Sequence, residues 1–133
     1  MLKVFLAEDE TVSRKAIKKM IQEMEDTEVI GEAENGVSAI EQLEKLVPDV
    51  VILDSNMPEM DGLTLAEWIR GHYPQVFLLF LTGYSSFAYA HKAIKLEALD
   101  YILKPTRQEE LRSALNRARI LVFGESLANR ERL

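Results

Sequence analysis

The chain has 133 residues, of which 47% are hydrophobic and 29% charged, a size and composition typical of one globular domain with its own apolar core. Its net charge of −6 argues against a nucleic-acid-binding surface, because phosphate contacts need clustered lysines and arginines. The apolar run 76–81 is too short to cross a membrane, and the absence of cysteine excludes disulfides and thiolate metal sites. We expect a cytoplasmic protein without a signal peptide, since the first residues lead directly into a strand-like segment.

Short apolar runs recur along the chain and predict strands. Each run is continuous rather than alternating, as in the strands of a parallel sheet that helices cover on both faces. The predicted strands are 4–7, 29–33, 50–53, 76–81 and 101–103.

Between these runs, apolar residues recur at the spacing of amphipathic helices. The first helix is expected to bury a stripe from Val12 to Met24 and to leave Arg14 and Lys18 in solvent. Strands that alternate with helices predict an α/β domain with a doubly wound (βα)5 fold and a five-stranded parallel sheet. The other predicted helical stripes span 37–47, 63–70, 87–94 and 111–122.

Polar residues follow four of the predicted strands at their carboxyl ends, where ligands bind in such sheets. Glu8 and Asp9 follow the first strand and Asp54 the third, while Thr82 ends the fourth and Lys104 follows the fifth. Three carboxylates at one edge repel one another and raise each other's pKa, which a hard divalent cation such as Mg²⁺ relieves. The hydroxyl and the ammonium indicate that an anion binds as well. A cation, an anion and a carboxylate together are what phosphoryl transfer to an aspartate requires.

Over residues 2–120 the chain resembles a response-regulator receiver domain, because four segments have the order and spacing of that family: "AEDE", "LDSNMPEMDG", "LTGY" and "DYILKP". The stretch 81–105 is similar to receivers of regulators whose effector is an AraC-type DNA-binding domain. The resemblance implies the flavodoxin-like strand order 2-1-3-4-5. It also implies a receiver over 1–122, with 123–133 as a helical extension or a linker to an effector domain that these residues lack. It also implies a signalling domain rather than an enzyme, with a sensor histidine kinase as its partner.

The resemblance assigns Asp54 as the phosphoacceptor. Glu8 and Asp9 would hold Mg²⁺ together with Asp54 and the backbone carbonyl of Asn56. Glu8 stands where aspartate is more frequent in the family, and Ser55 stands where an apolar residue is commoner, but neither change removes a required group.

The resemblance assigns Lys104 to the phosphoryl oxygens, and Thr82 would donate its hydroxyl to one of them. Tyr101 would turn inward when Thr82 moves, as part of the switch. The Lys104–Pro105 peptide bond is expected to be cis. The phosphorylated form is expected to dimerise through the fourth helix, fifth strand and fifth helix, and to reach DNA only through the effector domain, with no membrane contact.

Other interpretations stay open from the residues. A haloacid-dehalogenase-type phosphatase also uses a strand-end aspartate with Mg²⁺, but it needs an acid two residues later, where this chain has Asn56. A flavodoxin-like nucleotide binder needs a glycine- and hydroxyl-rich loop after the first strand, and "AEDETVS" places acids there instead. A domain that only binds partners would not need the full set of acids, hydroxyl and lysine. Taken one at a time, Asp54 fits a turn, Thr82 an ordinary strand and Tyr101 plain packing.

Overall fold

The computed structural model describes the backbone of residues 1–83 and 87–131, and the side chains of 1–83 and 88–124. Within these residues, five parallel strands form one sheet in the order β2-β1-β3-β4-β5, which confirms the predicted fold class. The last two residues of the predicted extension, 132 and 133, lie outside the described part. The strands are β1 (Leu2–Ala7), β2 (Thr27–Ala33), β3 (Val50–Asp54), β4 (Phe77–Thr82) and β5 (Asp100–Leu103).

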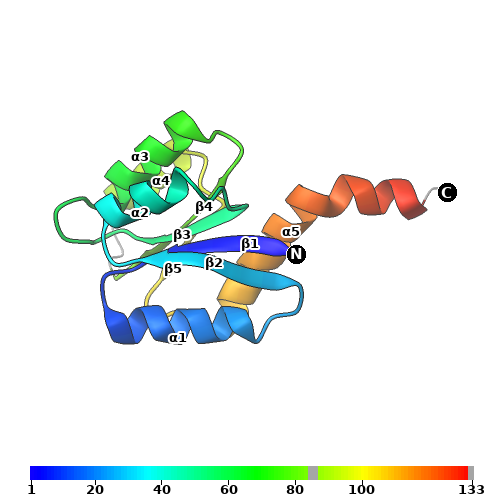
Figure 1. Cartoon of the computed structure of the whole chain (residues 1–133), viewed down its shortest axis with the longest axis horizontal. Helices are drawn as coiled ribbons and strands as arrows, with labels where there is room; N and C mark the ends of the chain where they lie inside the picture. Colours follow the sequence, from blue (N-terminus) through cyan, green and yellow to red (C-terminus); the bar gives the residue numbers. More distant parts are fainter. Residues whose placement is uncertain (84–86, 132–133) are drawn as a thin grey trace.

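Helices cover both faces of the sheet (Figure 1). On one face α1 and α5 pack over a core of aliphatic side chains, and on the other α2, α3 and α4 pack over a second core that includes Phe5 and Phe80. This two-sided burial explains why the strands read as continuous apolar runs. The helices are α1 (Thr11–Gln22), α2 (Gly36–Leu43), α3 (Gly62–His72), α4 (Phe87–Lys95) and α5 (Gln108–Glu131). Among the described residues, no helix has the length and apolar content that a membrane span requires.

Helix α1 departs from the predicted pattern at two positions. Val12 was expected in the core but is 83% exposed, because it lies in the first turn, beyond the strand surface that Ile17 and Ile21 cover. Arg14 was expected in solvent, but only 13% of its side chain is exposed. Its Nη1 donates to the backbone oxygen of Glu8 at 2.9 Å. The prediction that Arg14 faces solvent is therefore wrong.

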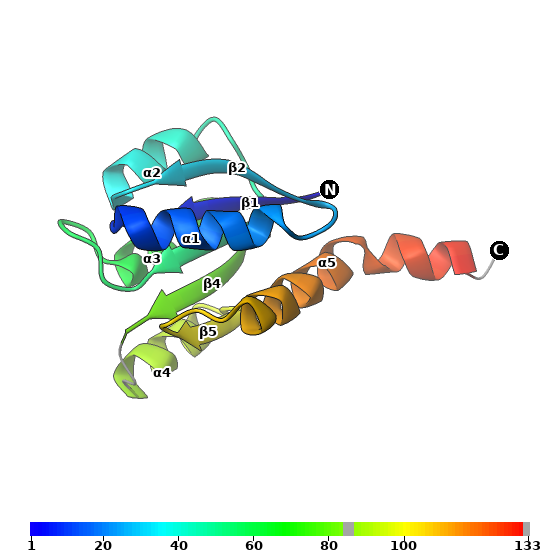
Figure 2. The same cartoon turned by 90° about the horizontal axis from the view of Figure 1, so that it is seen from below.

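Two predicted apolar stripes include residues that do not pack on the sheet. Helix α2 ends at Leu43, so Leu46 and Val47 lie in the following loop and are exposed. Helix α5 is buried as far as Ala118, whereas Leu121 is 61% exposed. Val122 and Phe123 still pack against the core as partly buried side chains, and the rest of the helix projects away from the body of the domain (Figures 1 and 2).

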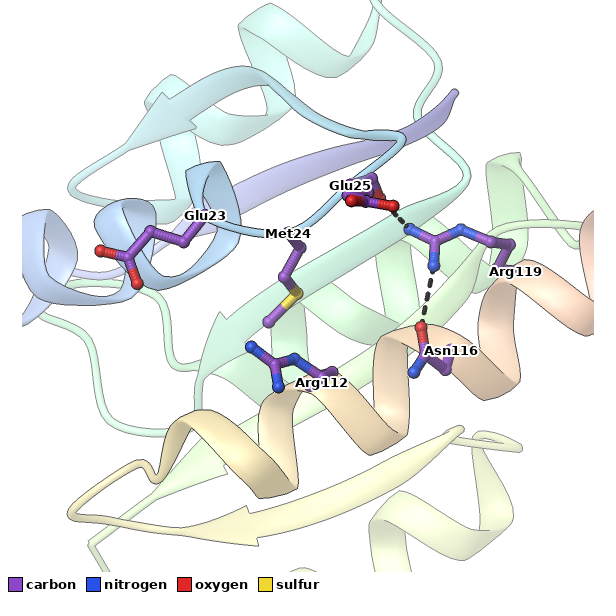
Figure 3. A pocket seen from close by; sticks show the side chains of 6 residues that line it. All are labelled: Glu23, Met24, Glu25, Arg112, Asn116 and Arg119. Carbon is purple, nitrogen blue, oxygen red and sulfur yellow. Dashed lines mark hydrogen bonds between the residues drawn. The ribbon is translucent and has the colours of Figure 1, made fainter.

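Arg119 holds α5 against the turn between α1 and β2, at the amino ends of the strands (Figure 3). Its Nη2 donates to the backbone oxygens of Glu25 at 2.8 Å and Asp26 at 3.4 Å, and to the hydroxyl of Thr27. Its Nη1 donates to Asn116 Oδ1 at 2.8 Å. One guanidinium therefore ties the last helix to the first half of the chain.

Strand β2 has one more residue than the regular ladder with β1 needs. Val4 pairs with Val29, but the next residue of β1, Phe5, pairs with Gly31, so Ile30 is skipped. From there the pairing is regular as far as Ala33.

Candidate functional site

Three acids meet at the carboxyl ends of two adjacent strands. Glu8 and Asp9 follow β1, and Asp54 is the last residue of β3, which pairs with β1. One oxygen of each carboxylate lies within 4.8 Å of those of the other two. Glu8 is fully buried and Asp54 is 3% exposed, while Asp9 is half-buried. The structure therefore forms the acidic cluster that the sequence placed at this edge.

Lys104 reaches the same cluster from the edge of the sheet. It follows β5, two strands away from β3, so its long side chain extends past the end of β4. Its Nζ donates to Glu8 Oε1 at 2.7 Å and lies 3.4 Å from Asp54 Oδ2. The Lys104–Pro105 peptide bond is cis, as the resemblance predicts. One ammonium thus faces two of the three carboxylates.

The three other residues that the resemblance assigns to the site lie in the loop after β3, at the end of β4 and in β5. The backbone N–H of Asn56 donates to Asp54 Oδ1 at 3.2 Å. Thr82 is fully buried at the end of β4, the strand between β3 and β5. Tyr101 is half-buried in β5, where it pairs with Phe80 and packs against the core. Asn56 and Thr82 therefore share the edge with the acids, and Tyr101 lies further back along β5.

The loop from β3 to α3 folds closely over Asp54. The N–H of Gly62 donates to the backbone oxygen of Ser55 at 3.1 Å, and a Cβ at position 62 would lie 2.2 Å from the backbone oxygen of Asp54. Only glycine leaves room for this approach. Asp61 begins α3 as its N-cap, since its Oδ1 accepts a hydrogen bond from Thr64 N at 2.8 Å. The "MPEMDG" segment thus sets the shape of the loop beside the acids.

Burial and mutual contact separate the pKa values of the two buried acids. Burial first, and then the hydrogen-bonded Glu8 carboxyl, raises the pKa of Asp54 to about 8. Burial acts to raise the pKa of Glu8 too, but hydrogen bonds with Asp54 and Lys104 lower it to about 2. Burial opposes the charge of Lys104, and its carboxylate partners more than offset this, so its pKa is raised. Two adjacent carboxylates that face a single ammonium favour the retention of one proton by the pair.

A divalent cation fits this cluster. Glu8 Oε2 and Asp9 Oδ1 are buried and have no hydrogen-bond partner in the described part of the chain. Buried oxygens of this kind are costly unless a cation or a water contacts them. The donor set consists of carboxylate oxygens, which Mg²⁺ prefers over nitrogen and sulfur ligands. The residues present are therefore suitable ligands for Mg²⁺.

Two residues of the first turn of α1 belong to the site, although the sequence analysis gave them no role in it. Ser13 lowers the pKa of the Glu8 carboxyl, and Arg14 donates to the Glu8 backbone oxygen. Helical side chains point back toward the helix N-terminus, so first-turn residues reach the segment that precedes the helix. Their position directly after the acid pair is the signal that could have identified them.

Comparisons with known proteins identify the family. Residues 4–116 match the response regulator receiver domain. The transcriptional regulatory protein BtsR of Salmonella typhi is 36% identical over 119 residues, which are 90% of this chain and 48% of BtsR, so the chain spans about half of that relative. The chemotaxis protein CheY of Listeria monocytogenes is 35% identical over 118 residues, 89% of this chain and 98% of CheY.

A solved structure shows the same fold with clear sequence similarity. The REC domain of AraT, a response regulator from Geobacillus stearothermophilus, has a TM-score of 0.84 and 38% identity, with 94% of this chain and 98% of that chain covered. The chain belongs to the response regulator receiver domain family, a family of signalling domains that typically switch on phosphorylation.

Proposed function

We propose that this receiver accepts a phosphoryl group on Asp54 from a phosphohistidine of a sensor histidine kinase. The observation that carries the proposal is the buried cluster of Glu8, Asp9 and Asp54 within 4.8 Å, faced by the ammonium of Lys104. Mg²⁺, when bound, would neutralise charge on the phosphoryl oxygens. The three acids and the backbone carbonyl of Asn56 would hold it.

In the transfer, a carboxylate oxygen of Asp54 forms a bond to phosphorus while the P–N bond to the kinase imidazole breaks. The electron pair of that bond stays on the imidazole nitrogen, which takes up a proton, and the product is an acyl phosphate. Asp54 must be ionised to attack, although burial favours its neutral form. Lys104 would favour the carboxylate and then contact the phosphoryl oxygens.

Hydrolysis of the acyl phosphate would be slow. The position two residues after the nucleophile is Asn56, whose amide cannot act as a general acid or base. The receiver would therefore store the phosphoryl group long enough to signal, and its own dephosphorylation would not amount to enzyme turnover.

Phosphorylation would shift the domain between two arrangements. A phosphoryl group adds about −1.5 to −2 charges at the end of β3. The hydroxyl of Thr82, at the end of the neighbouring strand, would donate to a phosphoryl oxygen, and the half-buried ring of Tyr101 would move into the space that it leaves.

The surface formed by α4, β5 and α5 would carry the signal as a homodimer contact. It exposes apolar side chains, with Ile94 at 73% and Leu103 at 45%. Asp100 and Arg117 form an ion pair between β5 and α5 on the same side of the sheet edge. Apolar groups ringed by charges are typical of protein contacts.

The output would be control of transcription through a DNA-binding domain outside these residues, of the AraC type by sequence resemblance. The name of BtsR, a transcriptional regulatory protein of about twice this length, supports a regulator with a further domain. The net charge of −6 supports placing DNA contacts outside this receiver.

The test is phosphorylation by acetyl phosphate, and beryllofluoride binding, with Mg²⁺ present. Wild type should gain one phosphoryl group by mass spectrometry, and Asp54→Asn should gain none. Asp61→Asn is the matched control, because Asp61 lies in the same loop but serves as the helix cap, a role that asparagine also fills. Equal labelling of wild type and Asp54→Asn, or loss of labelling in Asp61→Asn, would contradict the assignment.

A further inference from the structure

We infer that Arg14 is a positioning residue for the cation site: it fixes the backbone from which Glu8 and Asp9 project. The inference rests on the proposed Mg²⁺ site, but it concerns a residue that lies outside the acidic cluster. It assigns Arg14 no contact with the ion, the phosphoryl group or Asp54.

The guanidinium of Arg14 links three elements of the fold. Its Nη1 donates to the backbone oxygen of Glu8, directly after β1, at 2.9 Å, and its Nε pairs with Glu32 Oε1 of β2 at 3.3 Å. Glu32 Oε2 also pairs with Lys18 Nζ, one turn further along α1, at 2.8 Å. These cationic partners lower the pKa of Glu32, with Lys18 as the larger cause. Glu32 thus remains ionised and holds the guanidinium in one orientation.

The bond to the Glu8 oxygen acts on both acids at once. The carbonyl of Glu8 and the N–H of Asp9 belong to one planar peptide unit, so a hydrogen bond to the carbonyl restrains the backbone unit that joins the two acids. On the other side, the N–H of Glu8 donates to the backbone oxygen of Ala33 in β2 at 3.0 Å. The backbone of the acid pair is therefore held from both sides, and Arg14 supplies the hold on the helix side.

This position distinguishes positioning from simple electrostatics. Arg14 carries a positive charge near a site that binds a cation, so through charge alone it weakens Mg²⁺ binding, and its removal would strengthen binding. If Arg14 orients the ligands, its removal weakens binding instead. Residues that orient metal ligands typically contribute 10- to 100-fold to affinity. The two roles therefore predict changes of opposite sign.

The experiment measures the Mg²⁺ dissociation constant of the whole chain by calorimetry and by the backbone amide signal of Asp9 in NMR. Arg14→Gln should weaken binding roughly tenfold or more. Arg14→Lys keeps the charge but lacks the planar guanidinium that reaches both Glu8 and Glu32, so its Mg²⁺ affinity should lie between those of Arg14→Gln and wild type. Glu32→Gln still allows Arg14 to donate to the Glu8 oxygen, but it no longer fixes the orientation of the guanidinium. Its Mg²⁺ affinity should therefore fall severalfold.

Lys18→Gln is the matched control, because Lys18 shares Glu32 and the same helix but the structure shows no contact between its described side chain and Glu8. Its Mg²⁺ affinity should stay within about twofold of wild type, since it sits outside the hydrogen bond that orients the acids. Thermal unfolding with and without Mg²⁺ distinguishes positioning of the ligands from general stabilisation of the fold. If Arg14 positions the ligands, Mg²⁺ stabilises Arg14→Gln less than wild type, so the difference between their melting temperatures grows when Mg²⁺ is present. Unchanged or tighter binding by Arg14→Gln, or an equal loss in Lys18→Gln, would overturn the inference. Absence of Mg²⁺ binding by wild type would instead contradict the proposed function.

Discussion

At the amino ends of the strands, the turns have partners from within the chain: Arg119 donates to backbone oxygens of the α1–β2 turn, and Asp49 accepts from the N–H of Lys3 at 2.8 Å. At the carboxyl ends, Glu8 Oε2 and Asp9 Oδ1 are buried without a partner among the described residues. Near the amino ends, Arg119 Nε is a buried side-chain donor without a partner among the described residues, on a guanidinium whose other nitrogens are engaged. Among the described residues, folding thus leaves unpaired oxygen acceptors at the carboxyl edge and an unpaired nitrogen donor at the amino edge.

The difference teaches how one sheet serves both stability and binding. At the amino edge, Arg119 donates to backbone oxygens of the α1–β2 turn, and folding leaves no cluster of like charges there among the described residues. At the carboxyl edge, folding gathers three carboxylates and one ammonium, which leaves oxygen acceptors and negative charge for a ligand. Substitutions at the carboxyl edge should therefore respond to Mg²⁺, and those at the amino edge should not.

The largest effect is expected for Gly62→Ala at the carboxyl edge. The added methyl group would lie 2.2 Å from the backbone oxygen of Asp54, so the loop must shift. We expect the free energy of unfolding in urea to fall by about 3 kcal/mol. Gly71→Ala, at the other end of α3, is the control: nothing lies within 4 Å of its added methyl group, so stability should rise by about 0.5 to 1 kcal/mol. A loss in both variants would contradict the steric account.

Next is Lys104→Met. At pH 7.5, below both the ordinary pKa of lysine and its raised pKa in the fold, Lys104 is fully charged and its pairing is fully present. Its loss leaves buried Glu8 without its cation, so the free energy of unfolding should fall by about 2 kcal/mol without Mg²⁺. Saturating Mg²⁺ should recover part of this loss, because the ion supplies positive charge to the same acids. A deficit that Mg²⁺ leaves unchanged would mean that the ion binds elsewhere.

At the amino edge, Arg119→Met should lower the free energy of unfolding by about 1 to 2 kcal/mol, because the α1–β2 turn loses its donors. The deficit should be the same with and without Mg²⁺. Urea titrations under both conditions measure it. A Mg²⁺-dependent deficit would show that the two edges are not independent.

The smallest effect concerns pH. Because the pKa of Asp54 is raised to about 8, this carboxyl holds a proton at pH 7 that Mg²⁺ must displace. Mg²⁺ affinity should therefore rise as pH increases toward 8 and level off above it, by less than tenfold per pH unit for one shared proton. Calorimetry in two buffers of different ionisation enthalpy counts the released protons. In Asp54→Asn this pH dependence should disappear.

The strands and the residues at their carboxyl ends could be predicted because their signals are local, whereas the strand order came from the family resemblance. A strand buried on both faces reads as an apolar run, and the residue after it lies at the sheet edge whatever its chemistry. That rule placed Glu8, Asp9, Asp54 and Lys104 together before any coordinates. It could not predict that the pKa values of Glu8 and Asp54 shift in opposite directions, since this depends on distances between side chains from different strands.

The prediction that Val12 is buried and Arg14 exposed was wrong for a physical reason. Helical periodicity identifies an apolar face, but it carries no information about a main-chain acceptor outside the helix. The backbone oxygen of Glu8 is such an acceptor, and it draws Arg14 inward while Val12 lies past the strands. Polar partners of the main chain leave no pattern in the apolar spacing.

The skipped residue in β2 decides which side of the sheet Glu32 occupies. Side chains alternate along a strand, so a shift of one residue moves each of them to the opposite face. With Ile30 left out of the ladder, Glu32 pairs with Leu6 on the face that α1 covers; in an uninterrupted ladder it would pair with Ala7 and face α2. Deleting Ile30 would therefore make the ladder regular and still leave Glu32 opposite Leu6, so the ion pair between Glu32 and Arg14 should survive the loss of this residue.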